Sequence, residues 1–215
     1  MGRVLVEGKG AESFLNELTT NDVSKLAVGR GQYSLFCNAK GGIMDDLTIF
    51  RIANLRYLVV YNAGNRDKNW NWLLKNKTRA DLTVLDVSDD VAMFAVQGPR
   101  AGTVLWNVSG VQLDEVEKYG TKDVKMAGIP CLLTRSGYTG EDGFEVYVWN
   151  TSVKEPSNAL KVWEKLLSGG REVGISPVGL GARDVLRLEA GMCLYGNDIN
   201  ENTSPVEARL NWVVR

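Results

Sequence analysis

Two adjacent acidic residues, Asp45 and Asp46, follow a pair of glycines in the run Gly-Gly-Ile-Met-Asp-Asp-Leu. The alternating apolar residues that continue this run predict a strand, in which adjacent side chains point to opposite faces. We therefore expect that the two carboxylates cannot work as a pair. The face that carries Asp46 also carries Met44, Thr48 and Phe50, a mixture typical of a ligand pocket. From composition alone, an Asp satisfied by nearby backbone amides is the commoner outcome.

Two further charged residues lie in patterns that suit ligand binding. Glu145 follows a glycine-rich turn at residues 138–143, and a strand would present its carboxylate to a planar pair of donors, such as the edge of a pterin ring. The alternative is an ordinary hairpin whose glycines supply positive φ angles. Arg183 lies in a segment with helical periodicity, where it either pairs with a surface acid or clamps a ligand.

Composition excludes several classes of site. The chain has 215 residues, 44% of them hydrophobic, with 25 Lys and Arg against 26 Asp and Glu, and it has no histidine. Histidine is the commonest general base and metal ligand, so we expect carboxylates, Arg, Lys, Tyr or a bound cofactor to carry any chemistry, and no metal site. The balanced charge argues against nucleic acid or an anionic membrane as the main partner.

Location and cofactor class follow from other patterns. Three separate cysteines, Cys37, Cys131 and Cys193, show neither CxxC pairing nor the density of a secreted disulfide scaffold. No apolar run approaches the roughly 20 residues that span a membrane, and no secretory leader pattern is present. We therefore expect a cytoplasmic protein without a membrane segment. Residues 179–184 lack the final glycine and the parallel setting of a dinucleotide fingerprint, which argues against a nicotinamide or flavin site.

The elements that must position these residues come in two similar series. Residues 6–15 resemble residues 96–105, and residues 41–50 resemble residues 139–148, so a diverged duplication is the simplest interpretation. In the first series we predict strands near 3–7, 32–37, 43–52, 56–62 and 82–87, with helices near 11–18 and 65–77. The second series is predicted to repeat that order, with strands near 91–97, 122–127, 130–136 and 143–149 and helices near 99–107 and 157–168. A further helix is predicted at 179–190.

This order predicts an α+β fold of two packed ferredoxin-like modules, each a split β-α-β unit with an antiparallel sheet. The first module spans residues 1–88 and carries Asp46, and the second spans residues 89–200 and carries Glu145 and Arg183. The tryptophans are interpreted as packing residues rather than a base-stacking platform, because basic residues are not interleaved with them.

Six stretches of the chain resemble, in order, motifs of the glycine cleavage T-protein family of aminomethyltransferases. They are residues 18–23, 41–47, 96–99, 135–145, 179–192 and 201–205. The resemblance implies the folate-binding architecture of that family and transfer of a methylene group from the aminomethyl-lipoyl arm of the H-protein to tetrahydrofolate, with release of ammonia. It therefore implies tetrahydrofolate as the one-carbon acceptor and the lipoylated H-protein as the partner.

The same resemblance implies roles for individual residues. Asp46 matches the catalytic acid of the family, which orients and activates the folate nitrogen that attacks the aminomethyl carbon. Glu145 matches the residue that holds the pterin edge, and Arg183 matches a substrate-binding arginine. The positions that match the lining of the pocket are Tyr33, Val60, Asn62 and Tyr138. Family members begin upstream and continue into a β-rich C-terminal domain with a further substrate arginine, so residues 201–215 are expected to be a connector.

Three alternatives stay open. The first is a folate-dependent demethylase, or the folate domain of a dimethylglycine- or sarcosine-type oxidase. The second is a non-catalytic folate-binding protein, although the Lys-Gly-Cys motif of such relatives is absent from residues 191–196. The third is a fragment that is inactive alone because its sheet edges and apolar surface are uncovered.

Overall fold

The computed structural model describes all residues from 1 to 215, and they form two compact units. Unit 1 contains residues 1–88 and 193–215, and unit 2 contains residues 89–192. The boundary after Ser88 lies where the sequence predicted it. The C-terminal end differs, because residues 193–200 were expected in the second module and residues 201–215 as a connector. Instead, the whole segment 193–215 belongs to the first unit.

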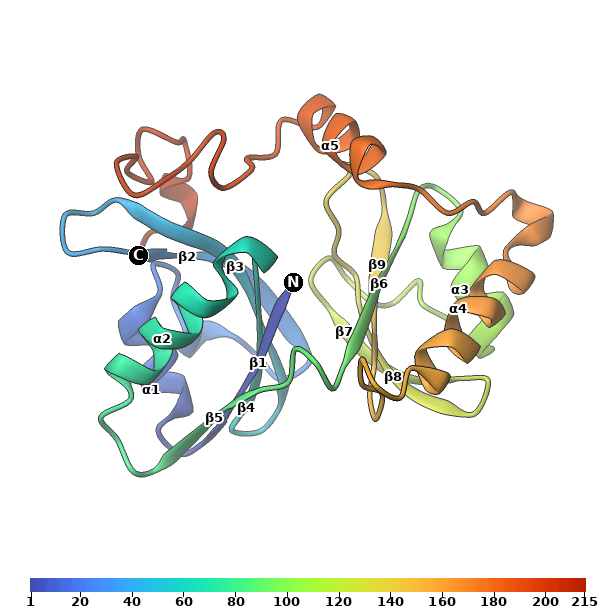
Figure 1. The fold of residues 1–215 in the computed structure, drawn as a ribbon, viewed down its shortest axis with the longest axis horizontal. Helices are drawn as coiled ribbons and strands as arrows, with labels where there is room; N and C mark the ends of the chain where they lie inside the picture. Colours follow the sequence, from blue (N-terminus) through green and yellow to red (C-terminus); the bar gives the residue numbers. More distant parts are fainter. The chain divides into compact units, whose positions relative to one another are not determined.

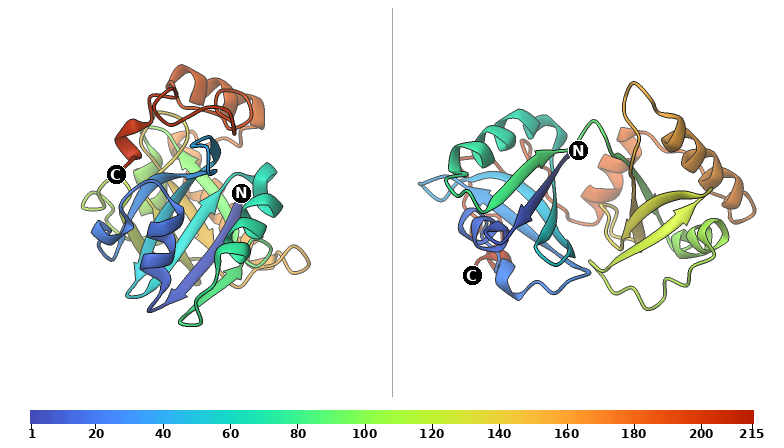
Figure 2. Two further views of the ribbon diagram at one scale, coloured as in Figure 1. Left: turned by 90° about the vertical axis from the view of Figure 1, so that its left-hand side faces the viewer. Right: turned by 90° about the horizontal axis from the view of Figure 1, so that it is seen from below.

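Unit 1 is built on a five-stranded antiparallel sheet in the order β2-β3-β4-β1-β5 (Figure 1). Helices α1 (Ala11–Leu18) and α2 (Arg66–Asn76) lie on one face of this sheet (Figure 2). Each strand begins and ends within two residues of its predicted bounds. The strands are β1 (Gly2–Gly8), β2 (Arg30–Cys37), β3 (Ile43–Ala53), β4 (Arg56–Tyr61) and β5 (Leu82–Asp86), and the short 3-10 turns are η1 (Val23–Lys25), η2 (Ala63–Asn65) and η4 (Asn211–Val213).

Alternation along the strands separates two apolar clusters of unit 1. On the helix side, Val4 and Val59 pack with Phe14 and Leu15 of α1, all of them buried. On the opposite side, Leu35 of β2 and Ile43 of β3 pack with residues of the C-terminal segment, namely Ile199, Leu210 and Val213. Burial of this second cluster explains why residues 193–215 return to unit 1.

The C-terminal segment also makes close backbone contacts at the start of β3. The Ile43 amide donates to the Thr203 carbonyl over 3.0 Å. At Gly42, an added Cβ would lie 1.7 Å from the carbonyl oxygen of Glu201. Any larger residue at position 42 would therefore push this segment away from β3.

Unit 2 is built on a four-stranded antiparallel sheet in the order β6-β9-β8-β7. Helices α3 (Ala101–Ser109) and α4 (Ser157–Gly169) pack on one face of it, mainly through Val104, Leu105, Val162 and Leu166. The strands are β6 (Ala92–Gln97), β7 (Thr121–Met126), β8 (Ile129–Thr134) and β9 (Gly143–Val148), followed by η3 (Arg171–Val173) and α5 (Leu180–Glu189). The predicted α+β class with two antiparallel sheets is confirmed.

The prediction that the second series repeats the full order of the first is wrong in one respect. Unit 1 closes with β5 after α2, whereas α4 of unit 2 leads through η3 to α5 without a fifth strand. The segment between α4 and α5 explains this difference. Gly170, Gly174, Pro177 and Gly179 interrupt it, and Gly174 has a φ of +80°. Such a segment cannot continue a ladder of strand hydrogen bonds.

Helix α5 is unusually exposed. Arg187 is its one buried residue, whereas Leu180 is 82% exposed and Leu188 is 62% exposed. Arg187 donates to the Asp184 carboxylate over 2.8 Å and to the Met192 carbonyl over 3.2 Å, and these bonds stabilise the end of the helix.

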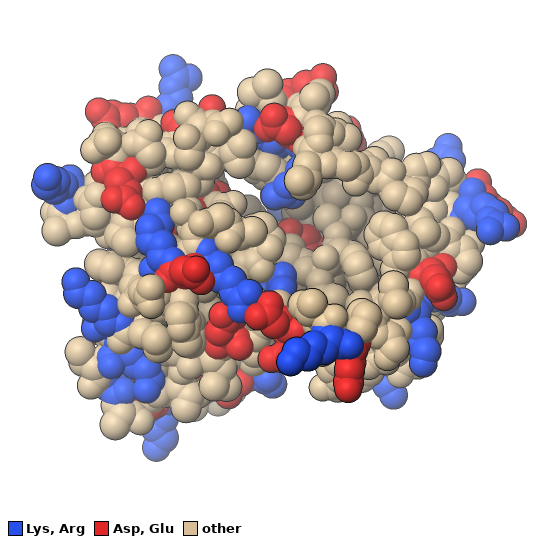
Figure 3. All heavy atoms as spheres, viewed as in Figure 1, with Lys and Arg blue, Asp and Glu red and all other residues tan.

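Elsewhere on the surface, acidic and basic side chains are interspersed on the face drawn in Figure 3. None of the helices combines the length and the apolarity needed to cross a bilayer.

Candidate functional site

Asp46 lies on β3, on the sheet face opposite the helices of unit 1. It pairs with Leu35, whose side chain belongs to the cluster on that face. Its Oδ2 accepts a hydrogen bond of 3.1 Å from the Tyr33 hydroxyl, and its Oδ1 accepts one of 2.7 Å from Nδ2 of Asn62. Burial raises the pKa of Asp46 to about 6, and the charge of Asp45 adds to the rise, while the bonds from Tyr33 and Asn62 oppose it. A carboxyl group with this pKa can exchange protons near neutrality.

Two of the predicted lining residues share this face with Asp46. Tyr33, Thr48 and Val60 lie opposite one another on β2, β3 and β4, and directly opposed residues of a sheet point to the same side. The Tyr33 ring stacks on Trp212, with ring centroids 5.7 Å apart and an interplanar angle of 19°. Trp212 is 64% exposed, so it packs at the surface rather than in a core.

Met44 does not lie where the alternation of β3 placed it. The pairing of β2 with β3 passes from Phe36 and Asp45 to Cys37 and Ile43, an irregularity that leaves Met44 without a partner. An extra residue of this kind is a β-bulge, and it reverses the face of the side chains beyond it. Met44 therefore packs in the helix-side cluster, away from the face of Asp46. The assignment of Met44 to the lining of the pocket was wrong for this reason.

Asp45 and Asp46 point to opposite sides of β3, as predicted, yet they are not independent. Nδ2 of Asn62 donates to Oδ1 of Asp45 over 2.8 Å and to Oδ1 of Asp46 over 2.7 Å. Asn62 directly follows β4 and precedes η2, so its side chain reaches the edge between the two carboxylates. The two carboxylates thus lie on opposite faces of the strand, and one amide connects them.

Three residues on η2 and α2 complete this region, and the sequence reasoning missed them. Asn65 and Asn69 donate to Asp45. Lys68 donates to the Met44 carbonyl over 2.7 Å, to the Tyr195 hydroxyl over 2.9 Å and to the Glu201 carboxylate over 3.2 Å. A signal was present, because Asn62, Asn65 and Asn69 are three and four residues apart, the spacing of one helix face.

Glu145 lies on β9 of unit 2, and its carboxylate is hydrogen-bonded through one oxygen. Oε2 accepts bonds from Ser136 over 2.7 Å, from Tyr147 over 3.1 Å and from Thr134 over 3.4 Å. None of these three bonds goes to Oε1, so that oxygen is left for a ligand donor. Burial raises the pKa of Glu145, while these hydroxyls and the charge of Arg183 lower it.

Gln97 at the end of β6 organises the turn that precedes Glu145. Its Nε2 donates to the carbonyls of Ser136 and Phe144, each over 3.2 Å, and its Oε1 accepts from the Thr139 hydroxyl over 3.2 Å. A Cβ added to Gly137 would lie 1.8 Å from Oε1 of Gln97. The glycines of this turn are therefore needed so that the Gln97 amide can fit beneath it.

Arg183 and Tyr138 form a pair in unit 2. The guanidinium carbon of Arg183 lies 4.4 Å from the centre of the Tyr138 ring, a cation–π contact. Arg183 is on α5, one turn before the buried Arg187, so its position depends on the packing of that residue. The surface ion pair considered from the sequence is not its main contact. The structure thus brings Tyr138 and Arg183 together and places the charge of Arg183 within reach of Glu145.

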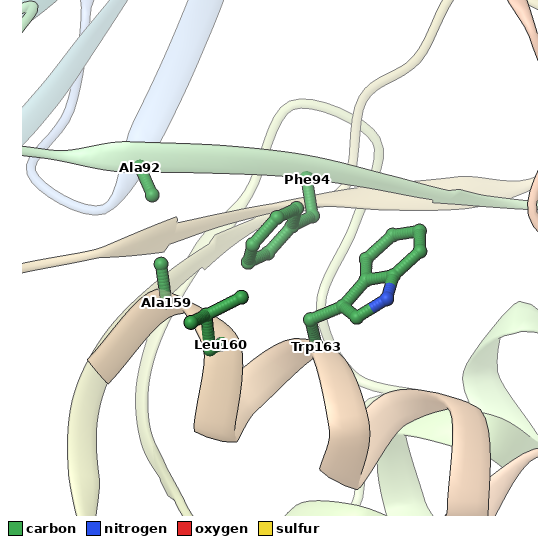
Figure 4. A pocket seen from close by; sticks show the side chains of 5 residues that line it. All are labelled: Ala92, Phe94, Ala159, Leu160 and Trp163. Carbon is green, nitrogen blue, oxygen red and sulfur yellow. The ribbon is translucent and has the colours of Figure 1, made fainter. Parts of the chain in front are cut away.

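An apolar hollow of about 380 Å³ lies elsewhere in unit 2, lined by Ala92, Phe94, Ala159, Leu160 and Trp163 (Figure 4). Phe94 pairs with Val146 on the helix side of the sheet, whereas Glu145 pairs with Ala95 and points to the other side. This hollow is therefore separate from the Glu145 group. No three Cys, Asp or Glu side chains are grouped so that they could hold a metal ion.

Comparisons with known proteins agree along the whole chain. Residues 1–215 match the model of the GCVT N-terminal domain. The chain is 44% identical to an aminomethyltransferase of Caldanaerobacter subterraneus subsp. tengcongensis, with 100% of this chain and 56% of the relative covered. It is 43% identical to an aminomethyltransferase of Halothermothrix orenii, of which it covers 58%, again over 100% of this chain. The chain thus spans a little over half the length of the curated relatives it matches.

Solved structures give the same result for the fold. The glycine cleavage system aminomethyltransferase T from Bartonella henselae matches with a TM-score of 0.87 and 37% identity, over 100% of this chain and 55% of that one. The heterotetrameric sarcosine oxidase from Corynebacterium sp. U-96 matches with a TM-score of 0.58 and 18% identity, over 83% of each chain, which shows a shared fold alone. The resemblance that the motifs indicated is confirmed, and the chain belongs to the GCVT N-terminal domain family.

Proposed function

We propose that this chain is the folate-binding part of an aminomethyltransferase of the glycine cleavage system. In this reaction, the methylene carbon exchanges its bonds to the lipoyl sulfur and the amino nitrogen for bonds to two nitrogens of tetrahydrofolate. Ammonia and the lipoyl thiol leave. The observation that carries the proposal is the 44% identity to an aminomethyltransferase over 100% of this chain. The lipoylated H-protein is the proposed partner, and a cytoplasmic location is proposed because the three cysteines are free.

Asp46 is the proposed catalytic residue. Its pKa of about 6 leaves it mainly ionised at neutral pH and still able to accept a proton. Tyr33 and Asn62 hold its two oxygens, so the carboxylate is fixed before a substrate arrives. A fixed carboxylate of this kind can orient a folate nitrogen and take up the proton that the nitrogen releases when it attacks. Val60 is the proposed apolar lining on the same face of the sheet.

Glu145, Arg183 and Tyr138 are the proposed folate-binding residues of unit 2. The open Oε1 of Glu145 suits one N–H donor of a pterin edge, and its three hydroxyl partners fix the direction of the carboxylate. Arg183 stacks on Tyr138 and lowers the pKa of Glu145, which favours the ionised form that accepts a hydrogen bond. These contacts support a role for Glu145 in recognition rather than in proton transfer.

Calorimetric titration of the chain with 5-formyltetrahydrofolate tests the binding half of the proposal. We expect saturable one-to-one binding that weakens tenfold or more in Glu145→Ala, because a hydrogen bond to a charged group contributes about 1.5–3 kcal/mol. Glu141→Ala is the matched control, since Glu141 is an exposed carboxylate in the same turn, and it should bind as the native chain does. A folded chain that gives no heat would contradict the proposal.

Ammonia release from aminomethylated H-protein tests the catalytic half. We expect Asp46→Asn to lower the rate by roughly 10²–10⁴-fold, the usual contribution of a general acid or base, while folate binding changes little. A chain that binds folate, releases no ammonia and instead takes one-carbon units from methylated amines would be a demethylase or oxidase domain. The shared fold with a sarcosine oxidase does not decide between these outcomes.

A further inference from the structure

Asp45 is a fully buried carboxylate whose partners are all neutral amides. The exposed fraction of Asp45 is 0%. Its Oδ1 accepts from the side-chain amides of Asn62 over 2.8 Å and Asn65 over 2.7 Å. Its Oδ2 accepts from the Asn62 backbone amide over 3.3 Å and from the side-chain amide of Asn69. Neutral donors satisfy the oxygens without cancelling the charge, so an ionised Asp45 acts on its neighbours at full strength.

Burial raises the pKa of Asp45, whereas the bonds from Asn62, Asn65 and Asn69 lower it. The orientation of Asn69 suits the ionised form. Its Nδ2 points to Asp45, and this leaves Oδ1 of Asn69 buried without a hydrogen-bond partner. An unsatisfied buried acceptor is unfavourable. If Asp45 carried a proton, a turned Asn69 amide could accept it and avoid part of this cost. The observed orientation instead adds a fourth N–H donor to the carboxylate, which suits the anion.

We propose that Asp45 is a positioning residue for Asp46: its ionised carboxylate, held by the amides of Asn62, Asn65 and Asn69, orients the Asn62 amide that binds Asp46 and makes Asp46 a better proton acceptor. The geometry is direct, because one nitrogen of Asn62 donates to both carboxylates. The charge of Asp45 is also the second cause, after burial, of the raised pKa of Asp46. Two carboxyl groups in different surroundings then divide the work, with Asp45 staying ionised and Asp46 exchanging the proton.

Other titratable groups face this pair from each neighbouring element. The Tyr33 hydroxyl on β2 donates to Asp46 and lowers its pKa. Tyr61 on β4 has a raised pKa through burial and nearby charges that include Asp45. Lys68 on α2 contacts the Met44 carbonyl, and its charge is paired with Glu201 and hydrogen-bonded to Tyr195. Unlike these three groups, Asp45 accepts a hydrogen bond from the same Asn62 amide as Asp46 does.

A titration of the side-chain carboxyl signals by ¹³C NMR, on the ligand-free chain, tests the coupling. In Asp45→Asn, we expect the pKa of Asp46 to fall from about 6 toward that of an ordinary aspartate, because the neighbouring charge is gone. Asp86→Asn is the matched control. It removes one negative charge from the same unit, where Asp86 pairs with Arg66, and it should leave the pKa of Asp46 unchanged. An unchanged pKa of Asp46 in folded Asp45→Asn would overturn the proposal.

A second variant answers the same question if Asp45→Asn does not fold, since that change places an amide among amide donors. Coupling between two groups is reciprocal, so the Asp45 carboxyl signal of the native chain should respond when Asp46 titrates near pH ~6, and this response should be absent from Asp46→Asn. Asp46 is only partly buried, which favours folding of this variant. An Asp45 signal of the native chain that shows no response near pH ~6 also overturns the proposal.

The consequence for turnover rests on the proposed aminomethyltransferase function. With aminomethylated H-protein, the acid limb of the rate profile should move to lower pH in Asp45→Asn and stay in place in Asp86→Asn, while folate affinity is retained in both. A limb that does not move contradicts the positioning role. If the native chain releases no ammonia, the proposed function fails, whereas the NMR titration still supports or overturns the coupling.

Discussion

The phenol oxygen of Tyr33 lies 3.1 Å from Oδ2 of Asp46, and the ring that carries this hydroxyl is stacked on Trp212. The residue that holds Asp46 is thus itself held by the C-terminal segment. The same segment meets Lys68 through Tyr195 and Glu201. The proposed catalytic carboxylate therefore depends on residues more than 140 positions further along the chain. Another contact of this segment, the hydrogen bond from Asn38 to the Glu201 carbonyl, joins residues 163 positions apart.

Tyr33→Phe should raise the pKa of Asp46 above its value of about 6. The lost hydroxyl is a donor to the ionised form, and losing a donor favours the protonated form. The measurement is the ¹³C titration of Asp46, and in the ammonia-release assay the acid limb should move to higher pH. Tyr57→Phe is the control, since it removes a similar bond of 3.2 Å to Glu12 in the same unit. An Asp46 pKa that falls or stays constant in Tyr33→Phe would be contrary to this account.

Asp46→Asn should make the chain more stable at neutral pH. The pKa of Asp46 rises from 3.8 to about 6 on folding, so its stabilising contribution is complete below pH ~4 and is lost as the pH rises through about 6. Above that pH, the buried charge costs up to roughly 3 kcal/mol, at 1.36 kcal/mol for each pKa unit. Denaturant unfolding near pH ~7.5 should show a gain of roughly 1–3 kcal/mol in Asp46→Asn, and the gain should vanish near pH ~4.

Asp86→Asn is the control with the opposite sign. Burial opposes the shift, but bonds from Ser88 and Arg66 leave the pKa of Asp86 below its ordinary value. A lowered pKa means that the ionised group stabilises the folded chain above the unfolded pKa, so its neutral replacement should be less stable near pH ~7.5. If Asp46→Asn and Asp86→Asn changed the free energy of unfolding in the same direction, the opposite pKa shifts of Asp46 and Asp86 would be refuted.

Lys68→Met should loosen the C-terminal segment from unit 1. The change keeps the apolar stem and removes the ammonium that joins Met44, Tyr195 and Glu201. We expect a loss of about 2 kcal/mol in the free energy of unfolding and faster amide hydrogen exchange at residues 195–203. Lys75→Met, an exposed lysine on the same helix, is the matched control and should change neither quantity. Equal exchange in the two variants would show that Lys68 does not hold the segment.

Arg183→Gln should raise the pKa of Glu145 further. Burial is the main cause of the present rise, and the positive charge of Arg183 is one of the groups that oppose it. Without this charge, a smaller fraction of Glu145 is ionised at a given pH, so folate binding should weaken at a higher pH than in the native chain. Carboxyl ¹³C titration measures the shift directly. Arg171→Gln, in η3 of the same unit, is the control and should leave the Glu145 signal as it is.

Local patterns in the sequence were sufficient for most of the fold. Alternating apolar residues located β3 and β4, and the spacing of Ala11, Phe14 and Leu15 located α1, because these patterns follow from the geometry of a strand and a helix. The pattern failed at Met44, because one extra residue in β3 reverses a face and only the pairing with β2 reveals it.

The sequence by itself determined the element order, the α+β class and the family, since each depends on residues that are close in the chain or on motifs in a given order. Only the tertiary structure decided that residues 193–215 return to unit 1, that Trp212 stacks on Tyr33, and that Asn62 joins Asp45 to Asp46. These relationships connect residues far apart in sequence through register, burial and the direction of single hydrogen bonds. Local composition does not encode such contacts, because they form only when the packed elements bring their partners within reach.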